Sequence, residues 1–277
     1  MDMQHIAPTL RQTPEGWWIP PDAVKEVSYP SEGNALFFAI EESSFWFAHR
    51  NQCILEAMQQ FPPTGIMLDI GGGNGFVATA IQQAGYEVAL VEPGIHGVQN
   101  AVKRGVRQVI HGTSDEAGIL PGSAGGVGLF DVVEHIQGDQ GFLTHIGQLL
   151  TPEGRVYITV PAYSWLWSHE DVLAGHARRY TLTSLSRVLK RAGFTIEYAT
   201  YFFSFLPPPS FIGRALPYRL GRAKPVLSED NVRSEHELSS PLAKRILSVF
   251  MDWELRRIAA RRIVPTGGSC LVIARKT

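Results

Sequence analysis

The sequence predicts an α/β fold built on a doubly wound, mostly parallel sheet of seven strands, the last of which is reversed. Three observations carry this prediction. Short apolar runs alternate with longer amphipathic segments from about residue 65 onward, which is typical of βαβ units. A turn rich in glycine follows the first of these runs. The final apolar run, residues 268–275, has no helix after it that would cover a further parallel strand.

Seven apolar runs are the expected strands. Six of them alternate with helical segments, and the seventh is expected to lie antiparallel beside the sixth because no crossover helix follows it. The first six runs are residues 65–70, 87–91, 108–111, 127–130, 155–160 and 194–201.

Amphipathic segments between these runs predict the helices. Gly85 and Gly193 end two of them, and Thr181 is a typical N-cap for the helix that Gly193 ends. Asp131 is expected to cap a helical turn after the fourth strand, as the first residue of the pattern Asp-Val-Val-Glu. The expected helices cover residues 74–84, 94–104, 141–150, 182–192 and 241–262.

The chain divides into four segments around this sheet. Residues 1–62 carry no strand pattern, and residues 33–60 have a helical one, so we expect an N-terminal helical cap over the carboxyl ends of the strands. Residues 63–202 form the ligand-binding core. Residues 203–240 are an insertion expected to cover the substrate, and residues 241–277 supply the last helix and the closing strand of the core.

Composition and charge exclude several classes of protein. Hydrophobic residues make up 44% of the 277 positions, which is enough for a core, and 26 acidic against 25 basic residues leave no positive field for nucleic acid. No leader or membrane-spanning run is visible, so we expect no integral membrane segment and a cytoplasmic location. Cys53 and Cys270 are the only cysteines, without the spacing of a zinc motif, so neither a disulfide framework nor a metal site is expected.

The most informative feature is the glycine turn after the first strand. Asp69 lies inside that strand, and Gly71, Gly73 and Gly75 follow it before a helix begins. Glycine lacks the Cβ that would keep a ligand away from the backbone. Glu92 ends the second strand, where an acid can accept hydrogen bonds from both hydroxyls of a ribose. The turn and the acid together predict a nucleoside cofactor.

Two cofactors are compatible with this turn. The pattern Gly73-Asn-Gly75-Phe-Val-Ala78 satisfies G-x-G-x-x-A, which keeps a nucleotide-dependent oxidoreductase as an alternative. Asp69 argues against that alternative, because an acid just before the turn repels a pyrophosphate. S-adenosylmethionine instead carries an ammonium and a sulfonium group, which a nearby carboxylate stabilises.

The string Asp69-Ile-Gly71-Gly-Gly73-Asn-Gly75 resembles the first motif of class I S-adenosylmethionine-dependent methyltransferases, and the resemblance extends over residues 40–275. It implies a Rossmann-like fold and methyl transfer to a small-molecule acceptor. Stretches that begin at Phe45, Gly128, Val160 and Gly175 are similar to the branch of the family that acts on small molecules. The chain departs from the family at residues 124–126, Ala-Gly-Gly, where the fourth strand of the family often begins with an acid.

The resemblance also implies which residues contact the cofactor. The glycines of the turn would line its methionine portion, and Glu92 would bind its ribose. Residues after the third strand would lie near the adenine edge, an aromatic residue at the end of the fourth strand would close on the cofactor, and two residues of the N-terminal helix would lie over it. The full set is Trp46, Arg50, Asp69, Gly71, Gly73, Gly75, Glu92, Ser114, Asp115 and Phe130.

His135 and His176 are the candidate catalytic bases, because an imidazole titrates near neutral pH. His135 follows the fourth strand, and His176 lies in the long loop after the fifth. A hydroxyl acceptor must lose a proton, whereas a neutral amine can attack directly, so the two histidines favour an oxygen acceptor. A non-catalytic S-adenosylmethionine-binding protein is a further alternative, and the sequence does not predict an oligomeric state.

Overall fold

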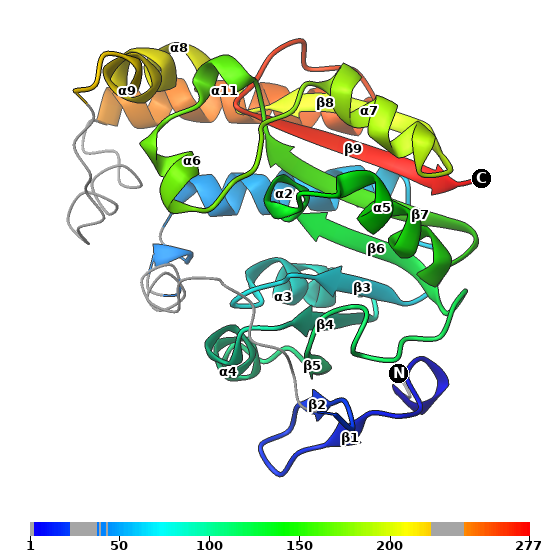
Figure 1. The fold of residues 1–277 in the computed structure, drawn as a ribbon. Helices are drawn as coiled ribbons and strands as arrows, with labels where there is room; N and C mark the ends of the chain where they lie inside the picture. The colour runs from blue at the N-terminus through cyan, green and yellow to red at the C-terminus, as the bar shows by residue number, and fades with distance from the viewer. Residues whose placement is uncertain (1–2, 23–37, 39, 43, 223–240) are drawn as a thin grey trace.

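A computed structural model of the chain describes residues 3–22, 38, 40–42, 44–222 and 241–277. Seven strands form the body of the sheet: β3 (Met67–Ile70), β4 (Val88–Glu92), β5 (Val109–His111), β6 (Ala124–Phe130), β7 (Leu150–Pro161), β8 (Phe194–Phe202) and β9 (Ser269–Lys276). They lie in the order β5-β4-β3-β6-β7-β9-β8, and β9 runs antiparallel to both of its neighbours (Figure 1). The predicted doubly wound sheet with a reversed last strand is confirmed.

Two short strands extend the sheet beyond β5. β1 (Arg11–Gln12) pairs antiparallel with β2 (Trp18–Ile19), and β2 pairs parallel with β5 through Trp18 and Ile110. The described sheet therefore has nine strands rather than seven. Residues 1–62 show no strand pattern in the sequence, yet this part of the chain contributes β1 and β2, because strands of two residues are too short to leave an alternating pattern.

Helices cover both faces of the sheet, so its strands are buried on both sides and read as continuous apolar runs. Side chains of α2, α3, α4 and α11 share one buried cluster with the sheet, and side chains of α5, α7 and the N-terminal turn η1 share the other. On the first face lie α2 (Phe45–Gln60), α3 (Phe76–Gln83), α4 (Ile95–Lys103) and α11 (Pro241–Ala259). On the second lie η1 (Met3–His5), α5 (Asp139–Leu149) and α7 (Leu182–Arg191).

Three helical segments follow β8 and form the described part of the insertion: α8 (Pro207–Ser210), the π-helical η4 (Phe211–Ala215) and α9 (Leu216–Arg219). Residues 223–240 of the predicted insertion lie outside the described residues, as do most positions of 33–43 in the predicted N-terminal helix. Among the described helices, none combines the length and the apolar character that crossing a bilayer requires.

The start of β6 explains the Ala-Gly-Gly departure from the family. The strand begins at Ala124, earlier than the predicted residue 127. A Cβ on Gly125 would lie 2.1 Å from the backbone nitrogen of Gly65. The N–H groups of Gly125 and Gly126 both donate to the carbonyl of Ile66, at 2.9 and 3.1 Å. Two backbones therefore approach here more closely than a side chain permits.

Gly125→Ala is expected to lower the free energy of unfolding by about 3 kcal/mol, because its methyl group would displace backbone rather than a flexible side chain. Urea denaturation measures this loss. Gly141→Ala is the matched control, since a Cβ at Gly141 in α5 meets no atom within 4 Å. Equal stability of the two variants would contradict the steric explanation.

Candidate active site

The strand ends that carry the predicted site residues meet at one edge of the sheet. β3 leads into the glycine turn, β4 ends at Glu92 and β6 ends at Phe130. Glu92 pairs in register with His111, the last residue of β5. Ligands of open α/β sheets bind in the crevice outside the carboxyl ends of the strands, so this edge is the candidate site.

Glu92 is buried against the glycine turn. Its Oε2 accepts a hydrogen bond from the N–H of Gly73 at 2.9 Å, and its Oε1 accepts one from Gly94 at 2.7 Å. Burial raises the pKa of the carboxyl, while the two N–H groups act in the opposite direction. A Cβ on Gly97 would lie 2.9 Å from Glu92 Cγ, so α4 can pack here only because that residue is glycine. No local pattern in the sequence indicates this role of Gly97.

The three glycines assigned to the methionine portion have different surroundings. A Cβ on Gly71 would lie 2.8 Å from Val132 Cγ2, and one on Gly75 would lie 2.9 Å from Ala101 Cβ. Gly73 has a φ of +52°, and a Cβ placed there meets no protein atom within 4 Å. Gly71 and Gly75 therefore allow close packing of the turn, whereas Gly73 faces open space.

Asp69 lies buried beneath the turn. Its side chain approaches Gly72 so closely that a Cβ there would lie 2.8 Å from Asp69 Oδ2. Within the described part of the chain Oδ2 has no hydrogen-bond partner. Burial raises the pKa of Asp69 to about 7, Arg50 lowers it and Glu92 raises it. A buried carboxylate oxygen without a partner is costly, and its position at the site fits a cationic ligand group.

Arg50 connects α2 to the end of β6. Its Nη1 donates to Asp131 Oδ2 at 2.6 Å, and its guanidinium carbon lies 5.0 Å from the ring centroid of Trp46. Trp46 in turn stacks on Phe203, the residue after β8, with ring centroids 5.3 Å apart. The structure thus brings Trp46 and Arg50 to the carboxyl edge of the sheet.

Asp131 does not have the capping role predicted for it. Its φ is +59°, and its Oδ1 accepts a hydrogen bond from Thr159 Oγ1 at 3.2 Å while Oδ2 pairs with Arg50. The turn that follows, η2 (Val133–His135), has no side-chain cap. Asp131 is therefore a candidate site residue that its local sequence pattern does not indicate. Its partner Arg50 is 81 positions away, which no local pattern reveals.

The two predicted bases lie side by side. His135 ends η2, and His176 follows the short helix α6 (His169–Leu173), yet their ring centroids are only 4.8 Å apart. Nδ1 of His176 lies 2.8 Å from Asp171 Oδ1, which also accepts a hydrogen bond from Arg179 at 2.7 Å. Burial alone would raise the pKa of Asp171, but the bonds from His176 and Arg179 hold it below its usual value.

The surroundings of His135 and Glu134 favour the neutral forms of these two side chains. Burial lowers the pKa of His135, and the neighbouring His176 lowers it further, so the imidazole is neutral at pH 7. Glu134 is fully buried, and neither of its carboxylate oxygens has a hydrogen-bond partner elsewhere in the described residues. Burial raises the pKa of Glu134, and Asp131 adds to the effect. Buried groups with shifted pKa values cluster at functional sites, which makes Glu134 a further candidate residue beside His135.

The remaining predicted residues have other surroundings. Ser114 is buried, whereas Asp115 is largely exposed and its Oδ1 lies 3.1 Å from His145 Nε2 on α5. Asp115 therefore lies beside α5, while Glu92 lies beside α4. The ring of Phe130 packs back on its own strand, where a Cβ on Gly128 would lie 2.3 Å from the ring.

This sheet order, together with a glycine turn bonded to the acid at the end of the next strand, defines the class of S-adenosylmethionine-dependent methyltransferases. A family model described as a methyltransferase domain matches residues 46–199. The match covers more than half of the chain, and the chain belongs to this methyltransferase family. The predicted class is confirmed, and the oxidoreductase alternative is not supported.

Solved structures share this fold at low sequence identity. Phosphoethanolamine N-methyltransferase 2 of Haemonchus contortus, in complex with S-adenosyl-L-methionine, has a TM-score of 0.55 at 20% identity over 94% of this chain and 61% of its own. An S-adenosylmethionine-dependent methyltransferase from Thermotoga maritima has a TM-score of 0.54 at 17% identity, with 88% and 99% coverage. A Haloferax volcanii methyltransferase in complex with the Trm112 activator has a TM-score of 0.57 at 14% identity, with 88% and 95% coverage. A search of curated protein sequences finds no match.

Proposed function

We propose that the chain transfers the methyl group of S-adenosylmethionine to a small-molecule acceptor at the carboxyl edge of its sheet. The observation that carries the proposal is the bond between the N–H of Gly73 and the Glu92 carboxylate, beside the open space that Gly73 faces. A glycine turn permits the close approach of a nucleoside ligand, and the strand-end acid accepts hydrogen bonds from its ribose.

The buried residues around this turn fit the charges of that cofactor. Asp69, whose Oδ2 is unpaired in the described structure, stabilises the ammonium group, while Arg50 and Trp46 cover the site from α2. Ser114, Asp115 and Phe130 are assigned to the adenine side by the family resemblance alone. When bound, the cofactor supplies a methyl group on a positively charged sulfur. The protein accelerates such a displacement mainly by orienting the reactants and excluding water.

An oxygen acceptor is our preferred substrate class. His135 is neutral at pH 7, and His176 beside it is oriented by Asp171, an arrangement that suits removal of a proton from a hydroxyl. Two of the solved neighbours are named as N-methyltransferases, for phosphoethanolamine and for histamine, and an amine acceptor would need no such base. The two histidines therefore favour oxygen in this chain.

The insertion after β8 is proposed to cover the acceptor. Phe211 of η4 contacts the ring of Trp165 at a centroid distance of 5.6 Å. Arg219 of α9 donates to the carbonyl of Trp165 at 2.9 Å. Trp165 belongs to the loop after β7, so the insertion packs on a loop at the carboxyl edge of the sheet, where a substrate would enter.

Two measurements test the proposal. Calorimetry of the purified chain should show binding of S-adenosylmethionine and S-adenosylhomocysteine, and methyl transfer from labelled cofactor should be higher to hydroxyl acceptors than to matched amines. Binding of NADH without a response to either sulfur compound would overturn the cofactor assignment. Cofactor binding without turnover on any acceptor would identify a non-catalytic binding protein instead.

Glu92→Gln is expected to weaken cofactor binding by about 1.5–3 kcal/mol, the cost of losing a hydrogen bond to a charged group. The amide keeps the size of the side chain and one acceptor oxygen, so one of the two bonds from Gly73 and Gly94 can persist, while the NH2 group faces the other N–H. Calorimetry gives the affinity and thermal denaturation gives the stability. A lower melting temperature with unchanged affinity would show that Glu92 is only structural.

Asp69 makes cofactor affinity depend on pH. With a pKa of about 7, its carboxyl is mostly protonated at pH 6 and mostly ionised at pH 8. An ammonium ligand favours the ionised form, so the affinity should rise up to about tenfold from pH 6 to pH 8, with about half a proton released at pH 7. Calorimetry in two buffers of different ionisation enthalpy measures the proton. Asp69→Asn should remove both effects, and equal affinities of the wild-type chain at the two pH values would contradict this role.

A further inference from the structure

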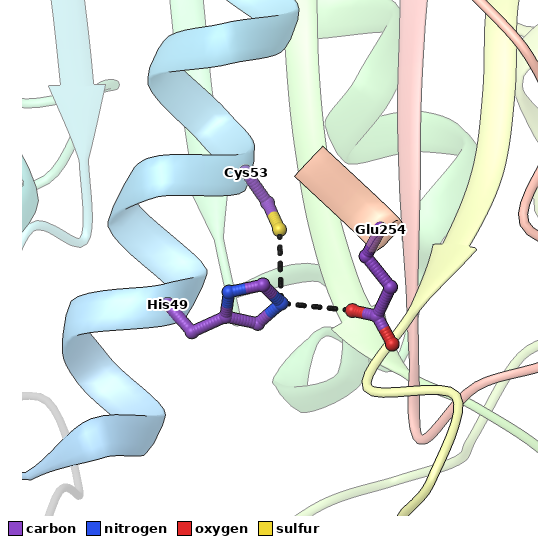
Figure 2. Close-up of side chains that lie close together, drawn as sticks. All are labelled: His49, Cys53 and Glu254. Atoms are coloured by element: carbon purple, nitrogen blue, oxygen red, sulfur yellow. Dashed lines mark hydrogen bonds and ion pairs between the residues drawn. The ribbon is translucent and has the colours of Figure 1, made fainter. Parts of the chain in front are cut away.

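Three side chains outside the candidate active site converge on one point between α2 and α11. His49 and Cys53 lie four residues apart on α2, and Glu254 projects from α11 toward them (Figure 2). His49 Nε2 lies 2.8 Å from Glu254 Oε2 and 3.5 Å from Cys53 Sγ. All three residues are 0% exposed.

This geometry does not fit a nucleophilic triad. In such a triad the histidine contacts the nucleophile with one ring nitrogen and the acid with the other. Here Cys53 and Glu254 both contact the same nitrogen, Nε2 of His49. Burial raises the pKa of the Cys53 thiol, and Glu254 adds to the effect, so the free thiol is a poor nucleophile.

A sulfur, an imidazole nitrogen and a carboxylate oxygen that converge supply three of the four donors of a tetrahedral zinc site. With Zn–S of about 2.3 Å and Zn–N and Zn–O of about 2.1 Å, tetrahedral angles give S···N of about 3.6 Å and N···O of about 3.4 Å. The Cys53 to His49 distance of 3.5 Å matches the first value. The His49 to Glu254 distance of 2.8 Å needs an opening of about 0.6 Å to reach the second.

Charge balance selects a divalent cation. A thiolate and a carboxylate carry two negative charges, and a neutral imidazole carries none, so a divalent ion makes the buried cluster neutral. A monovalent ion would leave one uncompensated charge in a place without water, which is costly. Thiolate and imidazole ligands favour zinc over magnesium or calcium. Binding releases the thiol proton of Cys53, since only the thiolate ligates the metal.

We infer that His49, Cys53 and Glu254 supply three ligands of a zinc site that holds α2 against α11. The carboxylate of Glu254 also accepts hydrogen bonds from the N–H of Phe203 at 2.9 Å and from Ser204 Oγ at 2.6 Å. Such outer-shell bonds orient a metal ligand. The metal thereby fixes the corner after β8, where the insertion begins, to the helix that carries Trp46 and Arg50.

No metal site is expected from the sequence, because the spacing of these residues matches no zinc motif. His49 and Cys53 are one helical turn apart, a spacing outside the Cys-x-x-Cys and Cys/His patterns of common zinc motifs. Glu254 is 205 positions from His49, so only the packing of α11 against α2 brings it to the pair.

Metal analysis of the full chain tests the inference. Because the site is fully buried, the protein is unfolded with chelator and refolded with Zn²⁺ or Co²⁺. We expect about one equivalent of metal per chain and, with Co²⁺, a thiolate-to-cobalt charge-transfer band. Cys53→Ser should remove the band and weaken metal retention at least about tenfold. Cys270→Ser is the matched control, because Cys270 is the other buried cysteine and its Sγ contacts only the carbonyl of Tyr180 among the bonds of the described residues.

X-ray absorption of the wild-type metal-loaded chain makes the test independent of whether the variants fold. One sulfur ligand together with nitrogen or oxygen ligands supports the inference. A folded wild-type chain that retains no Zn²⁺ or Co²⁺ overturns it, as does a charge-transfer band that survives in Cys53→Ser. None of these measurements depends on methyl transfer, so failure here and failure of the proposed function are separate results.

Discussion

Gly73→Val is expected to abolish detectable binding of S-adenosylmethionine, a loss of at least about a hundredfold in affinity, while the chain remains folded. A Cβ at Gly73 meets no protein atom within 4 Å, so the valine side chain projects into the open space beside the turn. The proposed ligand needs that space to approach the backbone of the turn and the Glu92 carboxylate. Calorimetry with the cofactor and with S-adenosylhomocysteine measures the loss.

Gly85→Val separates obstruction of the ligand from backbone strain. Gly85 follows α3, its φ is +92°, and a Cβ there also meets no atom within 4 Å. Both variants therefore carry the strain of a side chain in a left-handed conformation, about 1–2 kcal/mol. Only Gly73→Val should lose the cofactor. Cofactor affinity of Gly73→Val within about threefold of wild type would show that the ligand does not lie over this turn.

Most of the fold can be predicted from local patterns in the sequence. The strands are apolar runs because helices bury both faces of the sheet, and Thr181 caps α7 as predicted, accepting a hydrogen bond from the N–H of Ser184 at 3.1 Å. The strands β1 and β2 were not predicted because two residues cannot show a period. Gly125 shows a further limit, since its need for glycine comes from the backbone of Gly65 on a different segment.

Some residues of the candidate site could likewise be predicted from local patterns, and others could not. The glycine turn and Glu92 were predictable because consecutive βα units place the ends of neighbouring strands together. The pair Arg50–Asp131 depends on how α2 packs against β6, and nothing near either residue in the sequence indicates the other. The sequence around Asp131 fits a helix-capping pattern and so predicts a cap. In the folded chain its carboxylate pairs with Arg50 instead. Contacts between distant segments therefore assign the roles that local patterns leave open.

His135→Ala is expected to lower kcat on a hydroxyl acceptor by about 10²–10⁴ while leaving cofactor affinity nearly intact, the range for removal of a general base. Burial and the adjacent His176 lower the pKa of His135, so its proton-accepting form predominates at pH 7. In the wild type, kcat should rise with pH through this lowered pKa and then level off. That pH dependence should disappear in the variant. Initial rates with labelled cofactor at saturating acceptor measure both effects.

Three comparisons decide whether His135 is the base. His5→Ala in η1, an exposed histidine on the other face of the sheet from α2, should leave kcat unchanged. His176→Ala should lower kcat less than His135→Ala does, because His176 then only positions His135. Asp171 fixes the ring of His176, and that ring packs against His135 at a centroid distance of 4.8 Å. The loss in His135→Ala should shrink for acceptors that are already ionised at the assay pH, since these need no base. A nearly full kcat in His135→Ala on a neutral hydroxyl acceptor contradicts the assignment, and a large loss in His176→Ala under the same conditions transfers the role to the histidine that Asp171 orients.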